Sequence, residues 1–411
     1  MDEILRSYVP PMLTGIKLDE ALRIKPEYSE LIRKATEAER LIALQDLYSV
    51  YIPTDMSREI YSKLYLALLR SMSKKQSLTA IRQFSENQKI IRGKEFSSII
   101  GGSDSFTIIG DSGIGKSATV SRVIDMISGQ RVINLPNSMR IIPCVQIQTP
   151  ADCSVKGLLY EVLRKVDEIL DTRYHYNATR VGSTTDMLIG SVSTVALNHI
   201  GLLIVDEIQN VVNSKNGAVV VGMLTQLINN AGISICMVGT PKSALFFGQE
   251  MMLARRSLGL SYGPFSYDDT FTSFCEGLFQ YQYVQHKASL DEGILQWLYN
   301  HSHGNASIVV SLIHDAQEIA VLDGSEELSI VSLEKAYKSR LAMLHDYLYQ
   351  EPAQAKKKSF RKNSNTSTVE AAPESKEQNL ITGIVTRAKR LQKDIVEELV
   401  YYGVQITEVA V

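Results

Sequence analysis

Residues 106–122 read FTIIGDSGIGKSATVSR, and they constrain the fold more than any other stretch of the chain. An apolar run typical of a buried strand leads into a glycine-rich turn, and a helical pattern follows the turn. The turn fits the spacing G-x-x-x-x-G-K-[ST], in which backbone N–H groups converge on phosphate oxygens. We therefore expect a strand, a phosphate-binding loop and a helix in that order.

Each position of the glycine-rich turn has a physical role. Gly110, Gly113 and Gly115 allow the backbone to bend around phosphate oxygens, and the following helix directs its positive N-terminal end at them. Lys116 is expected to reach the β- and γ-phosphates of ATP, and the Ser117 hydroxyl to ligate Mg²⁺. The predicted ATP-binding residues are Gly110, Asp111, Ser112, Gly113, Ile114, Gly115, Lys116, Ser117 and Ala118.

A second apolar run, GLLIVDEIQN at residues 201–210, ends in two adjacent carboxylates. Asp206 is placed to hold Mg²⁺ together with Ser117, and Glu207 to polarise the attacking water as general base. A nucleotide kinase does not need a water-activating glutamate beside its metal-binding aspartate. The pair therefore favours a hydrolysing ATPase, although an Asp-Glu pair that only caps a helix is the structural alternative.

Two further segments supply candidate catalytic residues. The run ISICMVGTP places Thr240 where the apolar residues stop, in reach of the γ-phosphate or the lytic water. The segment QEMMLARRSLG carries Arg255 and Arg256 at the end of an apolar helical stretch. An arginine donated to a neighbour's γ-phosphate stabilises the transition state, which requires an oligomer. A turn at Thr240 and a surface charge pair at the arginines are the alternatives.

Short apolar runs after residue 100 alternate with longer helical stretches. Five runs have strand length: SFTIIG (105–110), IIPCVQIQ (141–148), GLLIVDE (201–207), ISICMVGT (233–240) and LFQYQYV (278–284). Three of them are almost continuously apolar, which is typical of parallel strands covered on both faces. We predict an α/β fold with a five-stranded parallel sheet flanked by helices.

The segments outside this alternating region are helical or polar. Thr54 or Asp55 is placed to cap a long helix that follows YIPTDM. A polar, charged stretch with the basic run KKKSFRK predicts a flexible linker, before apolar residues return at the C-terminal end. The predicted domains are a helical extension (1–100), a nucleotide-binding core (101–287), a helical lid (288–350), a linker (351–377) and a partner-binding tail (378–411).

The charge and the apolar pattern limit the partners of the chain. A formal net charge of −2 over 411 residues gives no general basic field, so any contact with nucleic acid must be local. The N-terminus lacks the pattern of a signal peptide, and no apolar run reaches the roughly 18 residues of a membrane span. We expect a soluble cytoplasmic protein without a membrane partner.

The order of these motifs resembles the AAA+ P-loop ATPases over roughly residues 100–345. Finer detail resembles the TnsC/TniB group, the ATP-dependent regulators of Tn-seven-like and CRISPR-associated transposons. The resemblance lies in YIPTDMSREIYSKLYLALLRSM before the core, PADCSVKGLLYEVLRKVDEILDTRY after the second strand, and VDEIQN followed by MVGTPKSALFF. It implies an AAA+ core with an N-terminal helical extension and a small C-terminal helical lid.

The same resemblance implies function and partners. Family members assemble with ATP into rings or filaments around double-stranded DNA, link a target selector of the TniQ/TnsD type to transposase subunits, and disassemble on hydrolysis. Gly113, Lys116, Ser117, Asp206, Glu207, Thr240, Arg255 and Arg256 inherit the nucleotide roles. Lys156, Thr172 and Arg173 are carried over as DNA contacts that suit phosphate groups, with a solvated helix face as the alternative for Lys156. The resemblance also implies a DNA-associated protein of the bacterial cytosol.

One segment departs from the AAA+ pattern. Many AAA+ lids carry an arginine near Gly-Asn that senses the γ-phosphate, but HSHGNASIVVSL has none. Asn305 or Ser307 is the weaker candidate for that contact. His301 and His303 lie close together, but without a third ligand they indicate a structural pair rather than a metal site.

Other functions stay open at this point. A replication initiator or loader shares the fold, although no complete sequence-reading domain fits between the lid and the linker. A scaffold that binds ATP without turnover also fits, because turnover depends on how a neighbour closes the site. A small-molecule phosphotransferase is disfavoured by the Asp-Glu pair and the two arginines. The C-terminal tail is a candidate for docking on a transposase subunit.

Overall fold

The chain divides into two compact units, Met1–Gln350 and Glu351–Val411. The computed structural model describes residues 8–75, 105–129, 131–135, 140–150, 154–180, 184–212, 217–231, 233–243 and 259–341, all within the first unit. Arg255, Arg256, the basic run KKKSFRK and the C-terminal tail lie outside the described residues. In the part of the chain that is described, no helix combines the length and apolar character of a membrane span.

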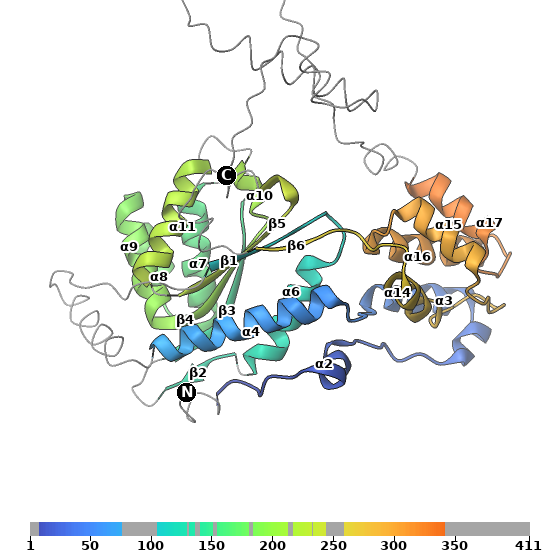
Figure 1. Cartoon of the computed structure of the whole chain (residues 1–411), viewed down its shortest axis with the longest axis horizontal. Coiled ribbons are helices and arrows are strands. Elements are labelled where there is room, and N and C mark those ends of the chain that lie inside the picture. The colour runs from blue at the N-terminus through green and yellow to red at the C-terminus, as the bar shows by residue number, and fades with distance from the viewer. Residues whose placement is uncertain are drawn as a thin grey trace, which may run out of the picture. The chain divides into compact units, whose positions relative to one another are not determined.

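A six-stranded sheet forms the centre of the first unit, in the order β2-β3-β4-β5-β1-β6 (Figure 1). Its strands are β1 (Ser105–Gly110), β2 (Ile133–Asn134), β3 (Arg140–Gln148), β4 (Ile200–Asp206), β5 (Ser234–Gly239) and β6 (Leu260–Tyr262). Five strands are parallel, and the short β2 pairs with β3 in the antiparallel direction. The predicted α/β class with five parallel strands is therefore confirmed.

The identity of the fifth parallel strand differs from the prediction. Residues 278–284 form no strand, because helix α14 (Asp269–Phe279) extends into this segment and Tyr281, Tyr283 and Val284 are buried in a helical cluster. The three-residue β6 supplies the fifth parallel strand instead, and it pairs with β1. A short run such as LSY carries too little periodicity to predict a strand, whereas the aromatic run LFQYQYV mimics one.

Alternate residues of the central strands point into two separate hydrophobic clusters. Leu203 and Val205 of β4 pack with α7 (Val155–Leu170), α9 (Thr185–His199) and α11 (Gly217–Ala231). Leu202 and Ile204 pack on the other face with α2 (Gly15–Leu22), α4 (Asp55–Lys75) and α6 (Lys116–Ser128). Figure 1 shows these two helical layers on either side of the sheet. Both faces are covered, which explains the continuous apolar strand sequences.

A third cluster unites the lid helices with part of the N-terminal segment. The lid contains α14, α15 (Glu292–Ser302), α16 (Ala306–Leu322), α17 (Ile330–Ala336) and the π-helical turn η4 (Tyr337–Leu341). Leu44 and Leu47 pack into this cluster from α3 (Glu37–Leu44) and the 3₁₀ turn η2 (Gln45–Ser49), which follow the 3₁₀ turn η1 (Glu30–Lys34). The remaining elements are α8 (Tyr174–Arg180), α10 (Gln209–Val212) and the 3₁₀ turn η3 (Pro241–Ser243).

The N-terminal segment contacts the core at both ends and the lid in between. Arg122 of α6 donates hydrogen bonds to the carbonyl oxygens of Leu22 (3.1 Å) and Ala21 (2.6 Å). Arg40 of α3, which is 3% exposed, forms a bidentate ion pair with Glu326 in the lid at 2.5 and 2.6 Å. The chain then returns to the core in α4, whose N-cap is Thr54, one of the two predicted caps. One segment thus joins the lid to the nucleotide-binding core.

Candidate nucleotide-binding site

The glycine-rich loop connects the end of β1 to the start of α6, as predicted. Gly113 (φ 83°) and Gly115 (φ 96°) have left-handed backbone conformations that strain any residue with a side chain. Gly115 is also the N-cap residue of α6, so the helix N-terminus opens directly onto the loop. This geometry presents unpaired N–H groups and the positive end of the helix dipole to an anion.

The Lys116 side chain is buried and folds over the loop. Its Nζ donates to the carbonyl oxygens of Gly110 (2.8 Å) and Asp111 (2.7 Å). Burial lowers the pKa of Lys116, and the nearby carboxylates of Asp206 and Glu207 oppose that shift. An anionic phosphate next to this ammonium would favour its charged form further.

The two carboxylates after β4 differ in exposure and backbone conformation. Asp206 is buried, and one of its carboxylate oxygens accepts a hydrogen bond from the backbone N–H of Glu207 at 2.8 Å. Glu207 is exposed and has φ of 57°, a left-handed conformation that costs a non-glycine residue about 1 kcal/mol or more. The strained turn separates the roles of the pair, because it holds one carboxylate inward and leaves the other accessible to solvent.

Thr240 follows β5, which lies between β1 and β4 in the sheet. Its hydroxyl oxygen is buried and has no hydrogen-bond partner within the described residues. The Thr240 backbone N–H donates to Oε1 of Gln209 at 3.2 Å, and Nε2 of Gln209 donates to the Glu207 carboxylate. No sequence motif predicted a role for Gln209, whose only signal is its place two residues after Glu207 in VDEIQN.

A cavity of about 230 Å³ brings most of the predicted site together. It is lined by Ser112, Gly113, Gly115, Lys116, Ser117, Ala118, Asp206, Glu207, Gln209, Gly239, Thr240 and Ser307. Of the other predicted loop residues, Gly110 and Asp111 contact Lys116 from outside this lining, and Ile114 lines a neighbouring cavity. Arg255 and Arg256 lie in the segment that the structure does not describe.

The lid reaches the glycine-rich loop through the N-terminus of α16. Asn305 donates from Nδ2 to the carbonyl oxygen of Ser112 (2.8 Å), and the backbone N–H of Ser307 donates to that of Gly113 (2.9 Å). A Cβ atom at position 113 would lie 2.6 Å from Oδ1 of Asn305, so glycine is also needed for this approach. Ser307 lines the cavity, whereas Asn305 contacts the loop without lining the cavity.

A second cavity of about 280 Å³ is lined by another residue of the same loop. Ile114 of the loop, Met56 of α4, and Tyr262 and Phe265 from the segment before the lid contribute to its lining. Ala306 of the lid lines it too, next to Ser307 of the first cavity. These residues come from four separate parts of the chain, so local motifs predicted only Ile114, which belongs to the glycine-rich loop.

The three predicted DNA-contact residues do not form one patch. Lys156 is exposed in the first turn of α7, and Arg173 is exposed just beyond the other end of that helix, so about 21 Å of helix separates Lys156 from Leu170 at 1.5 Å per residue. The Thr172 hydroxyl donates to Asp167 at 2.6 Å, and the same carboxylate accepts the backbone N–H groups of Tyr174 and His175. Thr172 therefore helps to fix the turn between α7 and α8, and DNA contact by Lys156, Thr172 and Arg173 stays a prediction.

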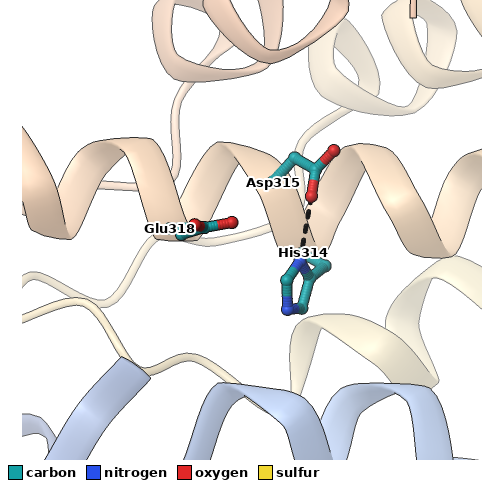
Figure 2. Close-up of side chains that lie close together, drawn as sticks. All are labelled: His314, Asp315 and Glu318. Atoms are coloured by element: carbon teal, nitrogen blue, oxygen red, sulfur yellow. Dashed lines mark hydrogen bonds and ion pairs between the residues drawn. The ribbon is translucent and has the colours of Figure 1, made fainter. Parts of the chain in front are cut away.

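One group of potential metal ligands occurs among the described residues, on α16. Figure 2 shows His314, Asp315 and Glu318 close together, with a hydrogen bond of 2.9 Å between the first two. Arg340 of η4 contacts Asp315 (2.9 Å) and Glu318 (2.5 Å), and it lowers the pKa of Glu318. Because the guanidinium neutralises the carboxylates, the cluster acts as an ion-pair network between η4 and α16.

His301 has the structural role that its sequence context indicated. Its ring stacks on Trp297 with centroids 3.8 Å apart, and its Nδ1 lies 2.8 Å from the Trp297 carbonyl oxygen. This ring therefore stabilises the end of α15.

The residues of the first cavity fit a nucleoside triphosphate with a divalent cation. The left-handed glycines, the Lys116 ammonium and the helix N-terminus suit phosphate oxygens. Ser117 and Asp206 both line the cavity and supply the oxygen ligands that Mg²⁺ prefers. The unpaired Thr240 hydroxyl supplies a further polar group that lacks a protein partner in the described chain.

A phosphate loop after β1, an acidic pair after β4 and a helical lid beside the loop together form a P-loop nucleotide-binding module. Residues 101–258 match the family model described as "Bacterial TniB protein". The match agrees with the resemblance seen in the motifs, and it shows that residues 101–258 are similar to the TniB proteins. No curated protein matches the chain.

Solved structures with a similar fold include origin-recognition proteins. The Aeropyrum pernix ORC1 protein in complex with DNA has a TM-score of 0.43 and 14% identity, covering 63% of this chain and 63% of that chain. The Aeropyrum pernix ORC2 protein with ADPNP and ADP has a TM-score of 0.43 and 14% identity, covering 70% of each chain. Drosophila ORC bound to DNA has a TM-score of 0.41 and 14% identity, covering 99% of this chain and 87% of that chain.

Proposed function

We propose that the chain binds and hydrolyses ATP with Mg²⁺. The observation that supports this most strongly is the single cavity that Lys116, Ser117, Asp206, Glu207 and Thr240 share, although they follow three different strands. Parallel strands place their carboxyl ends at one edge of the sheet, so these groups surround the same small volume.

The residues divide the work between binding and proton transfer. Lys116 and the loop N–H groups bind the β- and γ-phosphates, and Ser117 and Asp206 hold the Mg²⁺. When bound, Mg²⁺ neutralises charge on the phosphate oxygens. The Glu207 carboxylate accepts the proton of the attacking water, and the Thr240 hydroxyl orients that water or the γ-phosphate.

The second cavity suits the adenosine part of ATP. Met56, Ile114 and Phe265 provide apolar surface for a purine ring, and Tyr262 adds an aromatic ring. Since residues of one loop line both cavities, a nucleotide can extend along the loop from one cavity to the other. The N-terminal segment, through Met56 and Thr54, would then contact the bound nucleotide directly.

We further propose that ATP drives assembly on double-stranded DNA and that the assembly regulates transposition. The TniB-like match over residues 101–258 supports this proposal, as does the Asp-Glu pair of a hydrolysing enzyme. Arg255 or Arg256 would complete the site of the adjacent subunit, and Lys156 would face the DNA. Transposase subunits and a target selector of the TniQ/TnsD type are the proposed protein partners, with hydrolysis dismantling the assembly.

The ATPase proposal is tested by steady-state hydrolysis on duplex DNA. Glu207→Gln removes the proton acceptor while keeping the shape of the side chain, so kcat should fall by roughly 100-fold or more with nucleotide binding retained. A Glu207→Gln variant that turns over like the wild type would refute the assigned base.

The assembly proposal is tested separately by imaging and sedimentation with duplex DNA and a non-hydrolysable ATP analogue. Rings or filaments should form with the analogue and be absent without nucleotide. Lys116→Ala, with the same DNA, is the matched negative control. The proposal would be contradicted if particles formed equally with and without nucleotide. It would also be contradicted if no particles formed in either case.

A further inference from the structure

Gln209 forms hydrogen bonds to both catalytic elements of the site. It is the first residue of α10, and its carboxamide lines the phosphate cavity. The Nε2 group donates to the Glu207 carboxylate, while Oε1 accepts the backbone N–H of Thr240 at 3.2 Å. A carboxamide is suited to this place, because it offers a donor to the anion and an acceptor to the amide at once.

The surrounding backbone is built to admit this side chain. A Cβ atom at position 239 would lie 3.0 Å from Oε1 of Gln209, so Gly239 leaves space for the amide to reach Thr240. The backbone N–H of Ile208 donates to the Val238 carbonyl oxygen at 3.0 Å, which fixes the start of α10 against the end of β5. Gln209 therefore spans the gap between the ends of β4 and β5 on a short, anchored turn.

We propose that Gln209 is a positioning residue. It holds the Glu207 carboxylate at a fixed position relative to Thr240, so that both residues act on the same water. Glu207 needs such support, because it is exposed, itself has a strained left-handed backbone conformation and can otherwise rotate into solvent. This inference rests on the proposed ATPase function of the site. It adds that hydrolysis depends on a bond between the base and the β5 strand end.

Two substitutions distinguish the hydrogen bond of Gln209 to Glu207 from its hydrogen bond to Thr240. Gln209→Glu retains an acceptor for the Thr240 N–H but loses the donor to Glu207 and adds a like charge. Gln209→Leu keeps a similar volume and loses both bonds. In ATPase assays on DNA we expect kcat to fall about 10-fold or more in both variants, with KM within about twofold, since a bond to a charged group is lost.

The matched control is Asn210→Ala. Asn210 is the next residue of α10, and its side-chain amide donates to the Thr149 carbonyl oxygen at 3.0 Å. Its backbone N–H donates to the Glu207 carbonyl oxygen at 3.0 Å, and the substitution to alanine retains that bond. Its kcat should stay within about twofold of the wild type, as expected for a bond outside the site. An equal loss in the control would mean that α10 has only a structural role, and an unchanged or raised kcat in both Gln209 variants would overturn the positioning role.

A second readout requires no turnover. Hydrogen exchange of the nucleotide-free protein should show faster exchange at the Thr240 amide in Gln209→Leu, and wild-type protection in Gln209→Glu. Unchanged exchange of the Thr240 amide in both variants would show that the hydrogen bond between Gln209 and Thr240 is absent in solution. That result would overturn the positioning role.

A double substitution distinguishes this inference from the ATPase assignment. If Glu207 is the base and Gln209 acts through it, Gln209→Leu should add little to the loss already caused by Glu207→Gln. Fully multiplicative losses would overturn the inference and leave the ATPase intact. If Glu207→Gln itself keeps wild-type turnover, the assigned base fails instead.

Discussion

The phosphate cavity has two sides that are built in different ways. On the core side, Asp206 is the last residue of β4, and Glu207 and Thr240 directly follow β4 and β5. Lys116 follows β1 through the glycine-rich loop. On the lid side, contact depends on a few hydrogen bonds from the N-terminus of α16, and the lid is tied to the core by the N-terminal segment. The difference indicates that the core side supplies the chemistry, whereas the lid side sets how the loop is held.

The largest effect should come from the ion pair that attaches the N-terminal segment to the lid. Arg40→Met leaves Glu326 partly buried without its partner and should reduce the free energy of unfolding by about 3–5 kcal/mol. Denaturant unfolding measures this loss. The pair Arg40→Met with Glu326→Gln should recover much of it; a loss below about 1 kcal/mol in the single variant would show that the two regions are not coupled.

A smaller effect, confined to binding, is expected on the core side. Lys116→Ala removes a charge-assisted contact with phosphate, so ATP affinity should drop by about 100-fold, equivalent to nearly 3 kcal/mol. Titration with a fluorescent ATP analogue measures the affinity. The free energy of unfolding should change much less in Lys116→Ala than in Arg40→Met. Equal ATP affinities of Lys116→Ala and wild type would show that Lys116 does not bind the phosphates.

The lid contact should matter less for binding. Asn305→Ala removes both the N-cap of α16 and the hydrogen bond to Ser112, at a cost of about 1 kcal/mol to stability. ATP affinity should change by less than about fivefold, because the lost groups lie behind the loop. A loss of affinity as large as that of Lys116→Ala would mean that the lid senses phosphate directly.

The smallest expected effect concerns DNA and tests whether α7 takes part. Lys156→Ala should weaken DNA binding modestly and lower the salt dependence by about one counterion per subunit. Lys165→Ala on the same helix, whose ammonium pairs with Glu168 at 3.2 Å, is the control and should leave the salt slope unchanged. Identical slopes for both variants and wild type would remove Lys156 from the interface.

The core side of the site was predictable from the sequence because its residues occur in short motifs with fixed spacing. The loop glycines, Lys116, the Asp-Glu pair and Thr240 all line or support one phosphate cavity. Four of the five predicted parallel strands formed as expected, since buried parallel strands give unbroken apolar runs. These features depend only on local order along the chain.

The remaining features depend on contacts between distant segments. Met56 reaches the second cavity from the N-terminal segment, and Arg40 meets Glu326 across the chain. Gln209 stood next to a recognised motif, but its role follows from Thr240, which belongs to another strand. The three residues of β6 were too few for a periodic signal, and an aromatic segment of the lid resembled a strand instead.

We propose that hydrolysis on the core side sets how long an assembly on DNA lasts, and the lifetime of that assembly can be measured. Light scattering after a limited dose of ATP should rise with assembly and fall as ATP is consumed. Glu207→Gln should assemble to the same level and persist for far longer, because bound ATP is not hydrolysed. The contrary result is an equal lifetime for Glu207→Gln and wild type while the variant has lost turnover. It would show that ATP hydrolysis does not set the lifetime of the assembly.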